Sequence, residues 1–246
     1  MTTEQVIFGL AVFLVAGTVK GLVGLGLPTV TIALTSLVLP LTESIALITL
    51  PTIITNVWQA SVGGRFRYIV RRHWPLIVPL MVTLYLTMWL AGQNGPGWAS
   101  FVLGLVLVVY GAMGLGRLRL RLTPDLEKPL APVIGVISGF IAALVGVPVI
   151  PLMPYLQALE IRPAELVQTL GIVLCATSLT LTGSLLHFGL LEGPHALLSA
   201  AAMAPSMAGM CIGQRIRARL SLEQFRVAVF TALALTGLYT VLSRLL

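Results

Sequence analysis

Long apolar segments separated by short polar loops are the feature of this sequence that most restricts its fold. Ten can be marked, at about residues 5–23, 27–39, 43–62, 74–92, 98–116, 130–145, 147–159, 164–187, 194–212 and 222–243. Charged residues make up 9% of the chain, whereas a soluble domain carries about 25%. A run of about 20 apolar residues crosses a bilayer as a helix. The sequence therefore predicts an all-α polytopic membrane protein.

The second and seventh segments are too short to cross a bilayer without help. Each has about 13 residues, against the roughly 20 that a span needs. Each follows a glycine-rich stretch, Gly17–Pro28 for the second segment and Gly135–Pro148 for the seventh. Glycine and proline weaken a helix, so we predict a helix break in both stretches. The short segments are then half-helices, the return arms of re-entrant hairpins, or short buried spans.

Basic residues are concentrated in three loops, which predicts that these loops face the cytoplasm. They fill the third-to-fourth loop, the central loop and the flanks of the last loop, at Arg65, Arg67, Arg71, Arg72, Arg117, Arg119, Arg121, Lys128, Arg215, Arg217, Arg219 and Arg226. The loops at Gln93–Gly97 and around Glu192 have no Lys or Arg and are predicted to face outward. The excess of 15 Lys and Arg over 8 Asp and Glu therefore indicates topology, and no nucleic-acid partner is predicted.

The two halves of the chain repeat, which predicts inverted-topology repeats related by a hidden two-fold axis in the membrane plane. A shift of 120 positions aligns Gly26 with Gly146 and Pro28 with Pro148, and the order of long and short segments is the same. The charged stretch Pro124–Pro129 is interpreted as a solvated loop between the repeats. We predict one multi-pass transport domain in the cell inner (plasma) membrane, with an outside amino terminus, repeat one at 1–116, a cytoplasmic linker at 117–129 and repeat two at 130–246.

Lys20 is the strongest candidate for contact with a substrate. It lies inside the first apolar segment, where an ammonium at mid-membrane costs about 2.5–3.5 kcal/mol. If this segment crosses the bilayer fully, Lys20 lies near its inner end and its side chain reaches water. If the chain turns back at Gly21–Gly26, Lys20 lies near mid-membrane, beside the amino terminus of the segment that starts at Pro28. A cation beside a helix amino terminus forms an anion site.

Polar residues on the third and eighth segments are candidate walls of the same site. Their hydroxyls and amides can bind sulfonate or carboxylate oxygens without adding a buried charge, and Thr52 and Asn56 share a helix face at i, i+4 spacing. The alternative is interhelical hydrogen bonding, worth about 0.6 kcal/mol on average. The predicted substrate-binding residues are Lys20, Gly24, Gly26, Pro28, Thr52, Asn56, Gly146, Pro148, Thr177 and Ser178.

The other reactive residue types do not indicate an enzyme, a cofactor or a metal site. Ser184 and His187 have i, i+3 spacing, but no third catalytic group or oxyanion-hole motif accompanies them; His187 is instead a candidate gate near the outer face. Cys175 and Cys211 match no metal spacing. Every Asp and Glu lies at a segment end or in a loop, so no carboxylate is predicted to relay protons at mid-membrane. Both a proton and sodium stay open as the coupling ion.

The paired glycine-rich stretches Gly17–Pro28 and Gly139–Pro148 resemble the signature of the sulfite exporter TauE/SafE family, also called the toluene sulfonate uptake permease family. The resemblance covers almost the entire chain, including Thr169-Leu170, Ser184–His187 and Arg215–Ser221. It implies a secondary transporter for sulfite, sulfonates or related sulfur-bearing organic anions. The sequence departs from the family pattern where consecutive glycines are usual, at Leu27, Ala142, Ala143 and Val147.

We therefore expect a secondary transporter that moves a sulfur-containing organic anion across the inner membrane by alternating access. Leu27 and Val147 in place of glycines predict an apolar wall beside the anion site. Such a wall favours an arylsulfonate such as toluenesulfonate, and hence uptake over export. The alternatives are an exporter of sulfite or sulfoacetate and a passive anion channel. Besides the small anion and the coupling ion, the predicted partner is the lipid bilayer.

Overall fold

The computed structural model describes residues 3–23, 26–91, 97–116, 121–159, 161–190, 193–217 and 222–245. The regular structure in these ranges is α-helical, which confirms the predicted all-α class. Among the described residues, five helical stretches are long and apolar enough to cross a membrane, one of them running through α10 and α11, or up to six if α3 and α4, bent by 45°, form one span. The helices are α1 (Thr3–Val23), α2 (Leu27–Thr35), α3 (Leu41–Leu47), α4 (Thr49–Ser61), α5 (Phe66–Ala91), α6 (Ala99–Gly116), α7 (Pro124–Val145), α8 (Val149–Ala158), α9 (Pro163–His187), α10 (Gly193–Ala201), α11 (Met203–Arg217) and α12 (Leu222–Leu245).

Two of the predicted segments are each divided into two helices by one residue. The third segment is interrupted at Ile48, between α3 and α4, and the ninth at Ala202, between α10 and α11. In both cases a proline lies four residues after the last residue of the first helix, Pro51 after Leu47 and Pro205 after Ala201. A proline at that place has no N–H to bond the helix carbonyl, so the helix ends there.

The helix breaks are shorter than the sequence predicts. Helix α1 continues through Gly17 and Gly21, and helix α7 continues through Gly135 and Gly139, so the prediction of a break at these four glycines is wrong. Helix propensity is a weak preference that tertiary packing overrides, and all four glycines pack against a neighbouring helix. The described breaks lie later in each stretch, at Gly26 and at residues 146–148.

The start of α7 also corrects a prediction. The helix begins at Pro124, so the stretch Pro124–Pro129 is not a solvated loop but the first turns of a helix. Thr123 occupies the N-cap, proline follows it directly, and Asp125 and Glu127 lie in the first turn. These residues favour a helix amino terminus because proline suits the first turn and carboxylates complement the helix dipole. Residues 117–120 of the predicted linker lie outside the described ranges.

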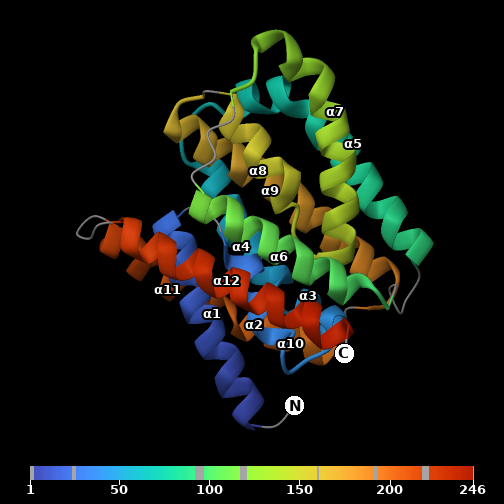
Figure 1. Ribbon diagram of the computed structural model, residues 1–246, viewed down its shortest axis with the longest axis vertical. Helices are drawn as coiled ribbons and strands as arrows, with labels where there is room; N and C mark the ends of the chain where they lie inside the picture. The colour runs from blue at the N-terminus through green and yellow to red at the C-terminus, as the bar shows by residue number, and fades with distance from the viewer. Residues whose placement is uncertain are drawn as a thin grey trace. The chain divides into compact units, whose positions relative to one another are not determined.

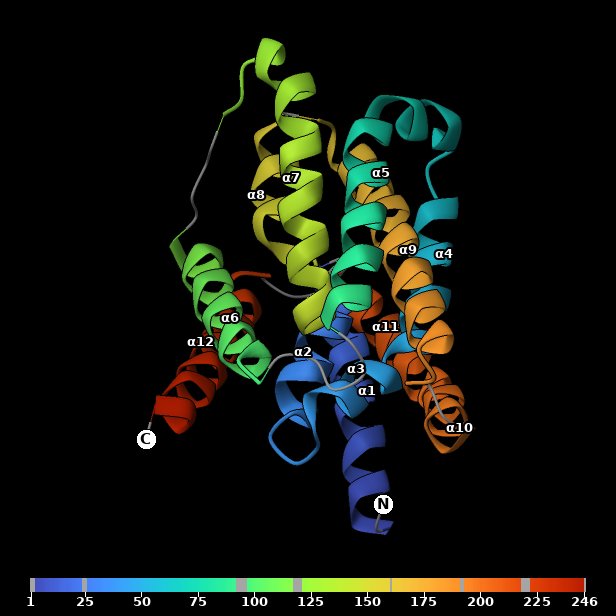
Figure 2. The same cartoon turned by 90° about the vertical axis from the view of Figure 1, so that its right-hand side faces the viewer.

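The helices form two compact units, and each unit is built from both halves of the chain (Figures 1 and 2). Unit one comprises Met1–Thr52, Gly97–Arg117 and Leu191–Leu246, and unit two comprises Ile53–Pro96 and Leu118–Leu190. The division falls inside α4. In unit one, α1 packs along α11 and α6 packs along α12; in unit two, α5 packs along α7 and against α9.

Glycines bring α1 and α11 of unit one into backbone contact. Gly17 and Gly21 of α1 face Ser206 and Met210, and Gly213 of α11 faces Thr18 and Gly21; the two helices therefore run in the same direction. A Cβ atom built on Gly21 would lie 2.9 Å from the Gln214 nitrogen and 3.0 Å from the Gly213 Cα. Small residues at four-residue spacing allow this approach in membrane helix pairs.

The pair formed by α5 and α7 in unit two has glycines on one helix only. Gly135 and Gly139 of α7 face the backbone of Leu76 and Leu80 on α5, so this pair is also parallel. Leu76 and Leu80 are fully buried, and they belong to the face of α5 that forms the core of the unit.

Candidate functional site

Four of the predicted site residues lie in unit one, at the junction of α1 and α2 and on α4. Lys20 is in the last turn of α1 and is only 3% exposed. Gly26 has φ of 109°, a left-handed conformation that glycine adopts readily, and it forms the N-cap of the nine-residue α2. Pro28 lies in the first turn of α2 and is buried. Gly24, which was also predicted to bind substrate, lies outside the described residues.

The amino terminus of α2 has the chemistry of an anion site. Its first turn contains no acidic residue, and its N-cap, Gly26, has no side chain with which to bond the first N–H groups. The first intrahelical bond runs from the Val30 N–H to the Gly26 carbonyl at 2.8 Å. Unpaired N–H groups and the positive end of the helix dipole attract an anion.

Thr52 and Asn56 lie one turn apart on α4 and are both buried, with exposed fractions of 4% and 2%. The Thr52 hydroxyl donates to carbonyl oxygens of its own helix, at 2.6 Å from Ile48 and 3.0 Å from Thr49. These two bonds are local rather than interhelical, and the role of Thr52 in substrate contact stays a prediction. Asn56 belongs to unit two by the division of the chain.

The remaining predicted residues lie in unit two, around the junction of α7 and α8 and on α9. Gly146 has φ of 80° and ends α7, with its N–H donating to the Ala142 carbonyl at 2.9 Å. Pro148 forms the N-cap of the ten-residue α8. The hydroxyls of Thr177 and Ser178 donate to carbonyls of their own helix, at 2.9 and 3.1 Å. Each unit thus contains one of the two glycine-interrupted junctions that the sequence predicts, Gly26 in unit one and Gly146 in unit two; that the two groups of residues form one site stays a prediction.

His187, the candidate gate, is the last residue of α9 and is exposed. Its ring centroid lies 4.9 Å from that of Phe188, edge to face, and 6.1 Å from that of Tyr85 on α5. The side chain therefore belongs to an aromatic cluster at the ends of α5 and α9. Its role as a gate stays a prediction.

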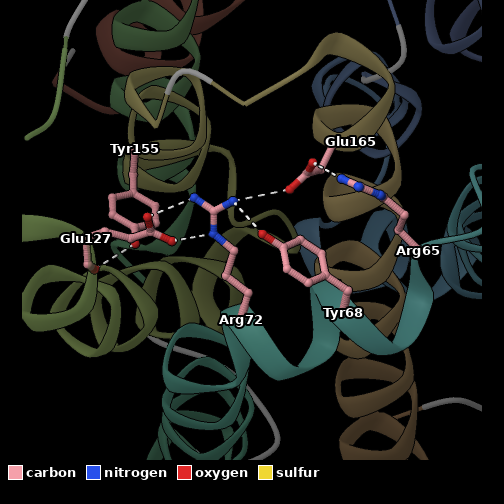
Figure 3. Close-up of polar contacts among 6 residues, drawn as sticks. All are labelled: Arg65, Tyr68, Arg72, Glu127, Tyr155 and Glu165. Carbon is pink, nitrogen blue, oxygen red and sulfur yellow. Dashed lines mark hydrogen bonds and ion pairs between the residues drawn. The ribbon is translucent and has the colours of Figure 1, made fainter. Parts of the chain in front are cut away.

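Sequence reasoning missed a network of charged residues in unit two, which consists of Arg65, Arg72, Glu127 and Glu165 (Figure 3). Arg72 of α5 holds Glu127 of α7 with two hydrogen bonds of 2.7 and 2.9 Å and donates to Glu165 of α9 at 3.2 Å. Arg65 donates to the other oxygen of Glu165 at 3.1 Å. The Tyr155 hydroxyl of α8 donates to the Glu127 carbonyl at 2.9 Å.

This charged network joins the beginnings of α5, α7 and α9 and the middle of α8. Arg72 and Glu127 are 55 residues apart, and Arg72 and Glu165 are 93 apart, so no local spacing indicates their contact. The signal in the sequence was the position of both glutamates at the start of apolar segments, opposite an arginine-rich loop. The geometry suits a structural tie between helix ends, because bidentate arginine–carboxylate pairs hold a fixed orientation.

The described residues contain no group of three or more His, Cys, Asp and Glu that is arranged to hold a metal ion. Cys175 and Cys211 are not joined in a disulfide.

The membrane-length helices and the short helices that follow glycine-containing junctions define a polytopic helical membrane protein. The family model described as "Sulfite exporter TauE/SafE" matches residues 9–240, nearly the whole chain. The chain belongs to the TauE/SafE family, and this membership identifies it as a membrane transporter. No curated protein and no solved structure matches the chain.

Proposed function

We propose that this protein is a secondary transporter that carries a small sulfur-containing anion across the cell inner membrane by alternating access. The family name supports sulfite as the type of substrate. The chemistry of the two glycine-interrupted junctions supports an anion of this kind, because a sulfur oxyanion presents several acceptor oxygens to N–H groups and to a cation.

The burial of Lys20 carries the proposal. Among the described residues, Lys20 and Glu165 are the charged side chains that are buried, and of the two Lys20 carries the positive charge that an anion requires. A lysine that reaches water from a membrane helix exposes its ammonium group, so an exposed fraction of 3% for Lys20 supports the binding interpretation. A buried ammonium in the last turn of α1, seven residues before α2 begins, is suited to hold an anion together with a helix amino terminus.

The family description favours sulfite over an arylsulfonate. The side chains expected to form the apolar wall, Leu27 and Val147, are about as buried as Lys20, so their exposure does not separate the two classes of substrate. On the family description we place sulfite, or a sulfonate of similar size, ahead of arylsulfonates, and export ahead of uptake. An aryl body that buried about 100 Å² of apolar surface would gain about 2.5 kcal/mol, which makes the two classes easy to separate by affinity.

The helix pairs support the inverted repeat on which alternating access depends. With the halves aligned, α1 corresponds to α7, α5 to α10 and α11, and α6 to α12. The pair α1 with α11 in unit one is then the counterpart of the pair α7 with α5 in unit two. The helices α6 and α12 are antiparallel, since Gly104 lies against Gly237 and Gly111 against Phe230 and Ala234. Opposite directions are expected of corresponding helices in an inverted repeat.

A binding experiment tests the proposal. Purified protein is titrated with sulfite, methanesulfonate and toluenesulfonate, and the affinity is measured by thermal shift, because a ligand stabilises the folded state that it binds. We expect Lys20→Ala to weaken binding by about 30-fold or more, as for loss of one partner from a buried charge contact. Lys20→Arg is expected to restore binding only in part, since the forked guanidinium is larger.

The matched control is Lys128→Ala, which removes the other lysine of the chain, an exposed residue of α7. We expect it to leave the affinity unchanged. Unchanged affinity in Lys20→Ala would return Lys20 to a structural role, and toluenesulfonate binding more tightly than sulfite would favour the arylsulfonate class. A carrier also shows counterflow, in which preloaded unlabelled substrate accelerates labelled uptake, whereas a passive channel does not.

A further inference from the structure

Helix α5 is longer than the apolar layer of a membrane. Its 26 residues extend about 39 Å at about 1.5 Å per residue, whereas the hydrocarbon core of a bilayer is about 30 Å thick. Roughly two turns therefore lie outside the hydrocarbon. The apolar segment that the sequence predicts here begins only at residue 74, so the projecting part is the arginine-containing start of the helix.

The exposed face of α5 shows where each membrane layer meets the helix. One stripe at spacings of three and four residues is exposed along its whole length, at Arg67, Arg71, Trp74, Val78, Val82, Tyr85 and Trp89. The opposite face, with Ile69, Leu76 and Leu84, is buried in the unit. Along the stripe, two arginines are followed by an aromatic residue, then by aliphatic residues, and then by aromatic residues again.

The aromatic residues place the arginines at the level of the lipid phosphates. Tryptophan and tyrosine gather at membrane interfaces, and from Trp74 to its end at Ala91 helix α5 extends about 26 Å, close to the thickness of the hydrocarbon core, so Trp74 marks one interface. Arg71 lies about 5 Å and Arg67 about 10 Å beyond Trp74, away from the hydrocarbon. The rule that arginine-rich loops face the cytoplasm assigns this end of α5 to the inner leaflet.

The charges of Arg67 and Arg71 are not compensated in the described part of the chain. The neighbouring arginines Arg65 and Arg72 form the ion pairs with Glu127 and Glu165, whereas Arg67 and Arg71 take part in none of them. Two exposed guanidinium groups one helical turn apart present forked donors that match a phosphate. Their charge is complementary to an anionic headgroup.

We propose that Arg67, Arg71 and Trp74 bind the headgroup of an anionic phospholipid, of the phosphatidylglycerol type, in the inner leaflet. The two arginines hold the phosphate, the indole of Trp74 lies at the headgroup level, and the acyl chains follow the aliphatic part of the stripe at Val78 and Val82. The surface is independent of the substrate and of Lys20.

Native mass spectrometry of the full-length protein in detergent tests this lipid site. The protein is titrated with phosphatidylglycerol and with phosphatidylcholine of the same acyl chains. We expect the unchanged protein to retain phosphatidylglycerol preferentially, and the double variant Arg67→Gln/Arg71→Gln to bind it about tenfold more weakly or worse, since each basic residue near an anionic surface contributes about 1 kcal/mol.

The matched control is Lys128→Gln/Arg162→Gln, which removes the same amount of charge from two other exposed residues of unit two. It is expected to bind phosphatidylglycerol as the unchanged protein does. Both double variants are expected to keep the lipid-free melting temperature, because the substituted side chains are exposed. Equal binding of the two lipids, equal losses in the two double variants, or displacement of the lipid by inorganic phosphate at the same concentration would each overturn the proposal.

Discussion

Two parallel helix pairs, α1 with α11 and α5 with α7, show two ways of fixing a long contact between membrane helices. The first pair, in unit one, has glycines on both helices, so that backbone meets backbone at Gly21 and Gly213. The second pair, in unit two, has glycines on α7 only, and they lie against the leucine-bearing side of α5. Unit two adds the ion pairs of Arg72 with Glu127 and Glu165 at the helix ends. Close packing of the two backbones stabilises the first pair, whereas packing and ion pairs together stabilise the second.

We expect the largest loss of stability from substitutions of the glycines that lie between the paired helices. A Cβ atom on Gly21 would meet three backbone atoms of α11 at 3.0 Å or less, whereas one on Gly135 would lie that close to one backbone atom of α5. Gly21→Ala is therefore expected to lower the free energy of unfolding by about 3 kcal/mol, the upper part of the range for overpacking, and Gly135→Ala by about half as much. Denaturant unfolding in detergent measures both.

Two other helical glycines serve as controls, because a Cβ atom on Gly9 of α1 or Gly183 of α9 would have no neighbour within 4 Å. Alanine there is expected to be neutral or to stabilise by up to about 1 kcal/mol, since alanine favours a helix over glycine. A larger loss at Gly135 than at Gly21 would contradict the distinction between the two pairs.

The charged network is expected to have the second largest effect. Arg72→Gln leaves Glu127 and the buried Glu165 without their shared partner, and we expect it to lower the free energy of unfolding by about 1–3 kcal/mol. The control is Arg71→Gln, an exposed neighbour on the same helix, expected to change stability by less than about 0.5 kcal/mol. A double-mutant cycle between Arg72 and Glu127 isolates their coupling. Additive effects of the two substitutions would show that the pair does not hold α5 to α7.

Thr49 and Thr169 occupy corresponding positions in the two halves, and we expect their substitution to have the smallest effect on stability. The Thr49 hydroxyl lies 3.2 Å from the Ser199 hydroxyl in unit one. The buried Thr169 hydroxyl of unit two has no hydrogen-bond partner among the described residues. We expect Thr49→Val to cost about 0.5–1 kcal/mol of unfolding free energy, and Thr169→Val to be neutral or stabilising, because it removes an unsatisfied hydroxyl. Thermal unfolding of both variants measures the difference, and equal losses would contradict it.

The sequence predicted the all-α class correctly because apolar length is a local property. The segments ended where glycine or proline interrupts the chain, and the residues at the described junctions, Gly26 and Gly146, were among those singled out. Where a contact joins distant parts of the chain, sequence reasoning failed. The glycines at 17, 21, 135 and 139 were interpreted as breaks, because the helix that each one packs against lies many residues away.

The same distinction between local signals and distant contacts applies to the candidate site. The burial of Lys20 and the left-handed conformation of Gly26 and Gly146 agree with local sequence signals, namely a lysine inside an apolar segment and glycines two residues before prolines. The contacts of Arg72 follow from the packing of α5 beside α7 and α9, which no spacing in the sequence reveals. Thr177 and Ser178 were selected by residue type and by their place in the segment that corresponds to the third one, and their hydroxyls bond within α9.

The order of the helices in the two units has a consequence for biosynthesis. The partners α5 and α7 are near neighbours in the chain, whereas α1 ends at Val23 and its partner α11 begins only at Met203. At about 5–20 residues per second, α1 leaves the ribosome on the order of ten seconds or more before α11 exists. During that interval the face of α1 that contains Gly17 and Gly21 cannot pack against its partner α11. Unit two is therefore the part of the protein that can assemble first during translation, and unit one is completed only once α11 and α12 have been made.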